Sequence, residues 1–154
     1  MKTDSRDTLV DTNILGYCYD NTAPAKQERA IHVVDGVARI QAGLISTQVL
    51  SEFYNTLTRK LSPRMTAVEA ERACREMLGA FWVWPTGVSI IKEAWRGVRR
   101  YGFNYWDALI WAAAREAAAS TVLTEDFTDG STIEGVTFLN PFTESFDLDA
   151  LLAR

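Results

Sequence analysis

The feature that most constrains the fold of this 154-residue chain is the alternation of short strand-like runs with longer helix-like runs. Strand-like runs lie at residues 7–11, 44–45, 81–84, 121–124 and 136–139. Between most of them, apolar residues recur at helical spacing. Successive strands joined by helices pair in parallel through right-handed crossovers, which place helices on both faces of the sheet. The sequence therefore predicts an α/β fold: a three-layer α/β/α sandwich with a central, mostly parallel sheet.

Capping signals locate the expected helices between these strands. The helix starts are predicted from residues that cap a helix N-terminus: Ser46 or Thr47, Thr66 (in a capping box with Glu69), Thr86 and Asn104. Gly102 is predicted to stop the helix that begins after Thr86. A further helix is expected from Pro24 to about Ala42, and a short one from Phe146 to Leu152. After the first strand we expect only a turn, at Thr12-Asn13.

Length and charge limit the domain organisation and the partners. A chain of 154 residues supports one domain with a substantial core. We therefore expect a single domain over residues 1–154, with residues 141–154 as a C-terminal tail. The net charge is −4. Broad electrostatic attraction to nucleic acid is not expected at this charge, although a local basic strip can still bind it.

Cysteine content and hydropathy bear on the compartment. Cys18 and Cys74 are the only cysteines, too few for a disulfide framework or a cysteine metal cage, which favours a reducing compartment. The longest apolar stretch is broken by Arg115 and Glu116 and is no membrane span. The N-terminal residues contain no apolar signal core. We expect a cytoplasmic protein with no membrane partner.

Four acidic residues are predicted to gather at one edge of the sheet. Asp11 ends the first strand, and Asp126 directly follows the fourth. Glu52 and Asp107 lie near the starts of two helices that begin at the same edge. The functional crevice of such a sheet lies at the carboxyl ends of its strands. If the first and fourth strands are neighbours, their carboxylates meet there.

Each acid also has a purely structural interpretation. Asp107 lies in a first helical turn, where the helix dipole favours a negative charge. Glu52 is interpretable as a solvated side chain and Asp11 as an Asx turn. Asp126 and Asp129 belong to a polar loop.

Taken together, the acids point to a metal site. Like charges brought this close repel unless a divalent cation lies between them. Ligands that are all oxygen, without His or Cys, favour Mg²⁺ or Mn²⁺.

Several segments, in this order along the chain, resemble those of a known family. They are LVDTNIL (9–15), ISTQVLSEFYN (45–55), FNYWDALIWAAA (103–114), VLTEDFTDG (122–130) and the closing VTFLNPF. In combination they resemble the PIN-domain ribonuclease family, and in particular the VapC-like toxins of bacterial toxin–antitoxin pairs.

The resemblance assigns roles to residues that match the family's motifs. It implies an acidic metal site formed by Asp11, Glu52, Asp107 and Asp126, with Asn13 and Thr124 as polar helpers. The fourth acid is open between Asp126, the better match, and Asp129. The implied activity is Mg²⁺- or Mn²⁺-dependent endoribonuclease cleavage of RNA that leaves a 5′-phosphate and a 3′-hydroxyl. The resemblance also implies a homodimer and a cognate antitoxin protein encoded nearby.

Basic and aromatic residues near these segments are candidates for holding an RNA strand. Two basic groups stand out, each also interpretable as a solvated helix face: Arg96, Arg99 and Arg100, and Arg59, Lys60 and Arg64. Tyr105 and Trp106 can stack a base, although we expect Trp106 to pack in the core.

Three other functions are alternatives to this one. Aspartate-nucleophile phosphatases need a second Asp two residues after the first, where this chain has Asn13. A receiver domain needs an acidic pair beside its first strand and a late Lys that VLTEDF does not supply. The main alternative is a catalytically silent PIN-like module that binds RNA or a protein partner.

Overall fold

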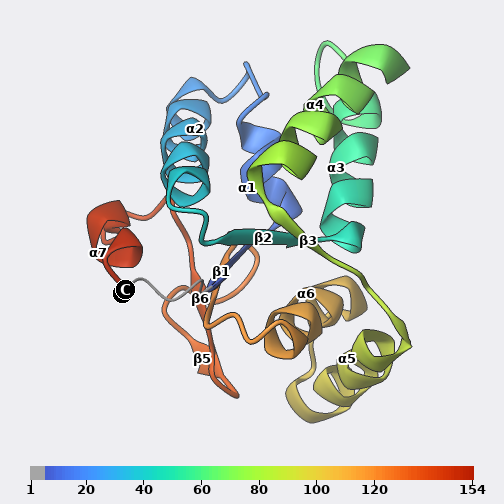
Figure 1. Cartoon of the computed structure of the whole chain (residues 1–154), viewed down its shortest axis with the longest axis vertical. Coiled ribbons are helices and arrows are strands. Elements are labelled where there is room, and N and C mark those ends of the chain that lie inside the picture. The colour runs from blue at the N-terminus through green and yellow to red at the C-terminus, as the bar shows by residue number, and fades with distance from the viewer. Residues whose placement is uncertain (1–5) are drawn as a thin grey trace.

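A central sheet with helices on both faces forms the structure, a computed structural model that describes residues 6–154 (Figure 1). The order across the described sheet is β3-β2-β1-β4-β6-β5. Its strands are β1 (Thr8–Val10), β2 (Gly43–Ser46), β3 (Trp82–Trp84), β4 (Thr121–Leu123), β5 (Thr132–Ile133) and β6 (Val136–Leu139). Neighbouring strands are parallel except β5 and β6, which are antiparallel. The predicted three-layer fold with a mostly parallel sheet is confirmed. The short edge strand β5 was not predicted.

The helices form the two outer layers. They are α1 (Thr12–Tyr17), α2 (Pro24–Arg39), α3 (Thr47–Arg59), α4 (Ala67–Ala80), α5 (Val88–Tyr101), α6 (Tyr105–Glu116) and α7 (Leu148–Leu152). Helices α1 to α4 lie above the sheet in Figure 1, and α5 and α6 lie below it. Helix α7, at the end of the chain, packs against α2, where Leu148 and Leu152 surround Gly36. Both layers bury apolar side chains against strands such as β1 and β4, which are buried along their whole length.

Most predicted caps are present. The Ser46 hydroxyl caps α3 by accepting from the Val49 N–H at 3.1 Å, and Thr66 forms its capping box with Glu69. Asn104 caps α6 by accepting from the Trp106 N–H. Gly102 ends α5 in the left-handed conformation, at φ 71°. The helix that carries Asp107 therefore starts where its local sequence specifies.

Two local predictions are wrong. The chain does not merely turn at Thr12-Asn13, because helix α1 begins at Thr12, directly after β1. This helix of six residues is too short to be stable by propensity, and burial of side chains such as Ile14 and Leu15 holds it. Thr86 does not cap α5, whose N-cap is Gly87. The Thr86 N–H donates instead to the Thr47 hydroxyl at 2.9 Å, which ties the start of α3 to the chain after β3.

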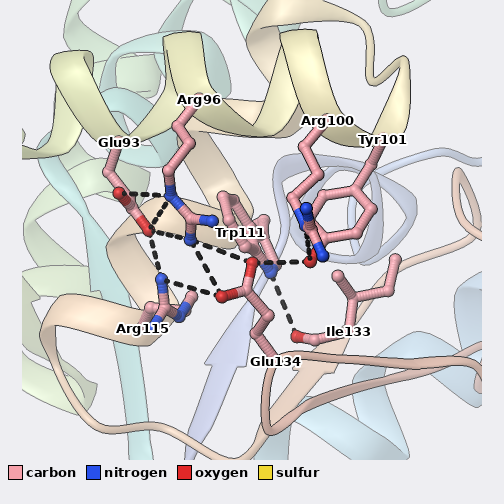
Figure 2. Close-up of polar contacts among 8 residues, drawn as sticks. All are labelled: Glu93, Arg96, Arg100, Tyr101, Trp111, Arg115, Ile133 and Glu134. Carbon is pink, nitrogen blue, oxygen red and sulfur yellow. Dashed lines mark hydrogen bonds and ion pairs between the residues drawn. The ribbon is translucent and has the colours of Figure 1, made fainter.

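Trp111 anchors α6 to the rest of the lower layer (Figure 2). Its ring is fully buried, and its Nε1–H donates to the Ile133 carbonyl of β5 at 3.1 Å. The rings of Tyr101 and Phe103 pack against it edge-on. Trp111 lies one helical turn after Asp107, so the same contacts fix the orientation of the helix that presents this acid.

An ion cluster covers the outer side of Trp111 (Figure 2). The guanidinium groups of Arg96 and Arg115 lie 5.5 and 5.3 Å from the ring centroid. Glu93 of α5 pairs with both arginines, and Glu134 joins from the turn between β5 and β6. The hydrogen bond from Arg96 lowers the pKa of both carboxyls. The cluster thereby ties α5, α6 and the β5–β6 hairpin together.

The close approach of α5 to Trp111 predicts the effect of one substitution. A Cβ atom at Gly97 would lie 2.8 Å from Trp111 Cζ3. We expect Gly97→Ala to lower the free energy of unfolding by roughly 1–3 kcal/mol, the usual cost of overpacking. Gly79→Ala is the matched control, because nothing lies within 4 Å of that position in α4. It should be neutral or stabilising. Urea unfolding measures both, and equal stability of the two variants would contradict this packing.

Candidate active site

The parallel pairing of β1 with β4 brings Asp11 beside Thr124. The register sets Val10 opposite Leu123, so the next residue of each strand emerges at the same edge. Thr124 Oγ1 donates to Asp11 Oδ2 at 2.8 Å, and the Thr12 N–H donates to Asp11 Oδ1 at 2.7 Å. Asp11 is only 4% exposed. Both of its oxygens are thus held in place at the carboxyl edge of the sheet, where the sequence predicts them.

Asp126 joins the same edge through Asn13. Asn13 Nδ2 donates to Asp126 Oδ2 at 2.9 Å, and the Asp126 N–H donates to Thr124 Oγ1 at 3.1 Å. The Asn13 amide orientation is set by this carboxylate, because only the nitrogen can donate to it. Within residues 6–154, the buried Asn13 Oδ1 has no hydrogen-bond partner. The protein therefore leaves one acceptor at this edge of the sheet unsatisfied.

Glu52 approaches from helix α3. Its carboxylate is held at both oxygens: Gln48 Nε2 donates to Oε1 at 2.9 Å, and Thr12 Oγ1 donates to Oε2 at 3.2 Å. Gln48 precedes Glu52 by one turn of the same helix, and Thr12 belongs to α1. Glu52 is therefore oriented toward Asp11 and is not a freely solvated side chain.

Asp107 completes the group from the first turn of α6. It occupies the favourable end of the helix dipole, as its structural interpretation proposes. Among residues 6–154, no donor forms a hydrogen bond with its carboxylate. Its position is thus compatible with both interpretations of its role.

These four acids line one open pocket of about 640 Å³. Asp11, Glu52, Asp107 and Asp126 come from four separate segments and face the same space. Asp129, the reserve candidate, is not part of the lining and accepts from the Asn140 N–H at 2.8 Å. Geometry therefore favours Asp126 over Asp129 as the fourth acid.

The pocket disfavours ionisation of two of its carboxyl groups. Burial raises the pKa of Asp11 to about 7, against the hydrogen bonds from Thr124 and Thr12, and the charges of Asp126 and Glu52 add to the increase. Burial also raises the pKa of Asp107 to about 6, again with the charges of Asp126 and Glu52. These carboxylates share a site that opposes their simultaneous ionisation.

The atoms that the pocket offers as ligands are of the type that a hard divalent cation prefers. Every acid offers only oxygen, and no cysteine or histidine lines the pocket. In the part of the chain that the structure describes, however, no three Asp, Glu, His or Cys side chains already stand close enough to form a preformed metal cluster. Holding a cation would therefore require the carboxylates to move inward, which their mutual repulsion opposes until the cation arrives.

Several pocket residues were not predicted from the sequence. Tyr17 and Glu125 line the pocket, and the Tyr17 hydroxyl donates to Glu125 Oε1 at 2.9 Å. Lys26 pairs with Glu125 Oε2, also at 2.9 Å. The sequence signal for Glu125 was its position next to Asp126. The contact of Gln48 with Glu52 was also predictable, because residues four apart interact on the surface of a helix.

The basic and aromatic candidates divide between the pocket and other surfaces. Lys60 lines the pocket. Arg96 does not, because it belongs to the ion cluster around Trp111. The prediction that Trp106 packs in the core is wrong: its side chain is 59% exposed and lines the pocket.

Comparison with known families decides the classification. The model of the PIN domain matches residues 8–128, a range that contains all six predicted site residues. The chain belongs to the PIN domain family. No curated protein matches the sequence of this chain significantly.

Solved structures with the same fold include bacterial toxins. The Mycobacterium tuberculosis protein VapC20, described as a sarcin-ricin loop cleaving toxin, has a TM-score of 0.60 and 19% identity over 83% of this chain and 98% of that chain. A toxin–antitoxin complex from Klebsiella pneumoniae has a TM-score of 0.63 and 20% identity over 88% and 98%. FitAB bound to an IR36 DNA fragment has a TM-score of 0.65 and 20% identity over 90% and 98%. At these identities, the similarity is one of fold.

Within residues 6–154, no helix has the length and apolar character needed to cross a membrane.

The raised pKa of Asp11 predicts how stability depends on pH. The folded protein binds this proton more tightly than the unfolded chain, so stability is lost as pH rises from about 4 to about 7 and then levels off. Asp11→Asn removes this loss, and its amide can still accept from the Thr12 N–H. With EDTA present, we expect the variant to exceed the wild type at pH 8 by roughly 1–3 kcal/mol, and the two to converge near pH 4. Urea unfolding across this range measures the difference. A variant that is less stable at pH 8 would contradict the charge repulsion.

Proposed function

We propose that this PIN domain is an endoribonuclease that depends on Mg²⁺ or Mn²⁺ and hydrolyses phosphodiester bonds of RNA. The observation that carries the proposal is the convergence of Asp11, Glu52, Asp107 and Asp126 on one pocket, with two of their pKa values raised. Side chains that repel one another at the edge of a stable sheet are a cost to folding. A cation bound between these carboxylates would offset that cost, which is a reason for a protein to place them together.

The four carboxylates would hold the cation. When bound, a divalent ion neutralises the charge of the phosphate and lowers the pKa of a coordinated water. Thr124 and Thr12 fix the two oxygens of Asp11, and Gln48 and Thr12 fix those of Glu52. These hydrogen bonds hold the acids at the site although their charges repel.

Asn13 has two roles in the proposed reaction. Its Nδ2 orients Asp126, and a small shift of the side chain would let its Oδ1, which has no partner within residues 6–154, accept a hydrogen bond from the attacking water. In the hydrolysis, the water oxygen bonds to phosphorus while the bond from phosphorus to the 3′ oxygen breaks. The 3′ oxygen takes up a proton, which leaves a 3′-hydroxyl and a 5′-phosphate.

The biological role that we propose is that of the toxin in a toxin–antitoxin pair, acting in the cytoplasm. Support comes from structures of the same fold, among them a toxin described as cleaving the sarcin-ricin loop and a toxin–antitoxin complex. The proposed partners are an RNA substrate and a cognate antitoxin protein. A PIN domain that binds RNA or a protein without cleavage is the second candidate, because the carboxylates stand apart in the described structure.

A homodimer is part of the proposal. Helix α5 buries Ile90, Ala94 and Gly97 against the rest of the molecule. Its other side exposes large apolar residues, including Trp95, which is 52% exposed. Val88 and Val98 lie at helical spacing from Trp95 on this surface. Such a patch fits a second copy of the chain or a partner segment.

The metal dependence is tested with Asp107→Asn. We expect Mn²⁺ to raise the melting temperature of the wild type, because a ligand that binds only the folded state stabilises it by mass action. The variant should keep or gain stability without metal, lose most of the Mn²⁺ shift, and cleave single-stranded RNA at least roughly 100-fold more slowly. Thermal melting with and without millimolar Mn²⁺, together with cleavage of labelled RNA, measures these effects.

Asp129→Asn is the matched control for this test. It removes a carboxylate of the same loop region that lies outside the pocket, so its metal shift and its cleavage rate should match the wild type. If Asp107→Asn keeps the full shift and still cleaves RNA, the metal site is wrongly assigned. If the wild type binds RNA but cleaves none with either metal, the silent-module alternative holds.

The dimer surface is tested with Trp95→Asp. A charge in the middle of an apolar interface is disfavoured, so the variant should be a monomer at concentrations where the wild type is a dimer. Light scattering at high micromolar concentration, without antitoxin, measures the mass. A dimeric variant would exclude α5 from the interface, and a monomeric wild type would contradict the homodimer.

A further inference from the structure

Trp106 presents a large aromatic surface inside the acidic pocket. Its side chain is 59% exposed, more than that of the other surface tryptophans Trp82 and Trp95, and it lines the pocket together with the four acids. The neighbouring ring of Tyr105 lies 5.3 Å away, at an interplanar angle of 59°, and supports it from one side. An exposed indole at this position is available to a ligand in the pocket.

Hydrogen bonds fix Trp106 next to the acids. Gln48 Nε2 donates to the Trp106 carbonyl at 3.2 Å and to Glu52 Oε1 at 2.9 Å. Trp106 also directly precedes Asp107 in α6. These contacts hold the backbone of Trp106 beside Glu52 and Asp107, and its side chain lines the same pocket as both acids, so a ligand on the ring lies in the acidic pocket.

A basic residue lies toward the other end of the pocket. The lining face of α3 runs from Glu52 through Asn55 and Thr56 to Lys60. Lys60 is eight residues after Glu52, about 12 Å along the helix axis. Gln48, which holds Trp106, lies one turn before Glu52. Along α3, Glu52 therefore lies between the residue that contacts Trp106 and Lys60.

We propose that Trp106 stacks an unpaired nucleobase next to the phosphate that is cleaved, and that Lys60 contacts a phosphate farther along the same strand. The inference rests on the proposed ribonuclease function and names two side chains that would hold its RNA strand. Stacking suits this pocket because it contributes without charge. An acidic lining repels a polyanion, so binding needs a contribution that does not come from general electrostatic attraction.

The test begins with kinetics of single-stranded RNA cleavage. Trp106→Ala should lower kcat/KM by roughly 5- to 100-fold, the range that base–aromatic stacking gives, mainly through KM. Trp106→Phe should recover most of this loss because a phenyl ring still stacks. Trp82→Ala is the matched control, since Trp82 is 52% exposed but does not line the pocket. It should match the wild type.

A second arm removes the base instead of the indole. Once the cleavage site is mapped from the product ends, the same RNA is made with an abasic nucleotide on either side of that bond. Binding is measured by fluorescence anisotropy on the Asp11→Asn background, where the RNA stays intact. One abasic position should weaken binding as much as Trp106→Ala does, and combining the two changes should add little, because both remove the same contact.

The outcomes separate this inference from the proposed function. If the wild type cleaves RNA and Trp106→Ala keeps its kcat/KM, the stacking role is overturned while the ribonuclease stands. If Trp106→Ala leaves RNA binding unchanged but abolishes dimerisation, the indole belongs to a protein interface and the inference is equally overturned. Additive losses from the indole and the abasic positions would also overturn it. A wild type that cleaves no RNA refutes the proposed function itself, and anisotropy of the same uncleaved RNA with the wild type and with Trp106→Ala then reports whether the indole contributes to RNA binding.

Discussion

The parallel pairing of β1 with β4 is the interaction on which the acidic pocket depends. It sets the ends of two buried strands side by side, so that Asp11 and Thr124 leave the sheet at one point. Two further acids are held relative to this pair: Asp126 through Asn13 and Thr124, and Glu52 through Thr12. Asp107 is placed by helix α6 alone. The backbone hydrogen bonds of the sheet thus supply the rigidity that a cluster of mutually repelling carboxylates lacks. A slip of one residue in this register would turn Asp11 and Thr124 to different faces.

The cluster illustrates how a fold tolerates unfavourable charge. Its hydrogen-bond donors stabilise the ionised forms, yet burial outweighs them at Asp11, whose pKa is still raised to about 7. The large apolar core on both faces of the sheet provides the stability against which this penalty is set. The same arrangement leaves Asn13 Oδ1 without a partner in the described structure, although most buried acceptors of a folded protein are satisfied. Both departures occur at the same edge of the sheet, which is where binding energy from a ligand can offset them.

The layers, the sheet direction and most helix starts were predictable, because periodicity and caps such as Ser46 and Asn104 act locally. Helix α1 was not, since six residues with little intrinsic helical preference fold only when packed. The convergence of the acids followed from strand-end positions. The exposure of Trp106 could not be predicted from the sequence, because a tryptophan in an apolar helix is usually buried. Only the rotation of the helix against α5 decides which of its sides faces the pocket. The ties from Lys26 and Tyr17 to Glu125 join residues nearly 100 positions apart or more, and no local pattern encodes them.

The ion cluster around Trp111 has a consequence for how the protein responds to added salt. Two kinds of contact hold α6 at this point: the partly exposed ion pairs of Arg96 and Arg115, and the buried ring itself. Added salt screens exposed charges, whereas it does not weaken the burial of an aromatic ring. The ring therefore keeps α6 in position when the surrounding ions are screened. A contact between a lysine and a phosphate has no buried apolar part to maintain it. Its strength comes from the release of counterions, so added salt weakens it directly. Ionic strength should accordingly weaken the proposed contact of Lys60 with a phosphate well before it disturbs the shape of the pocket.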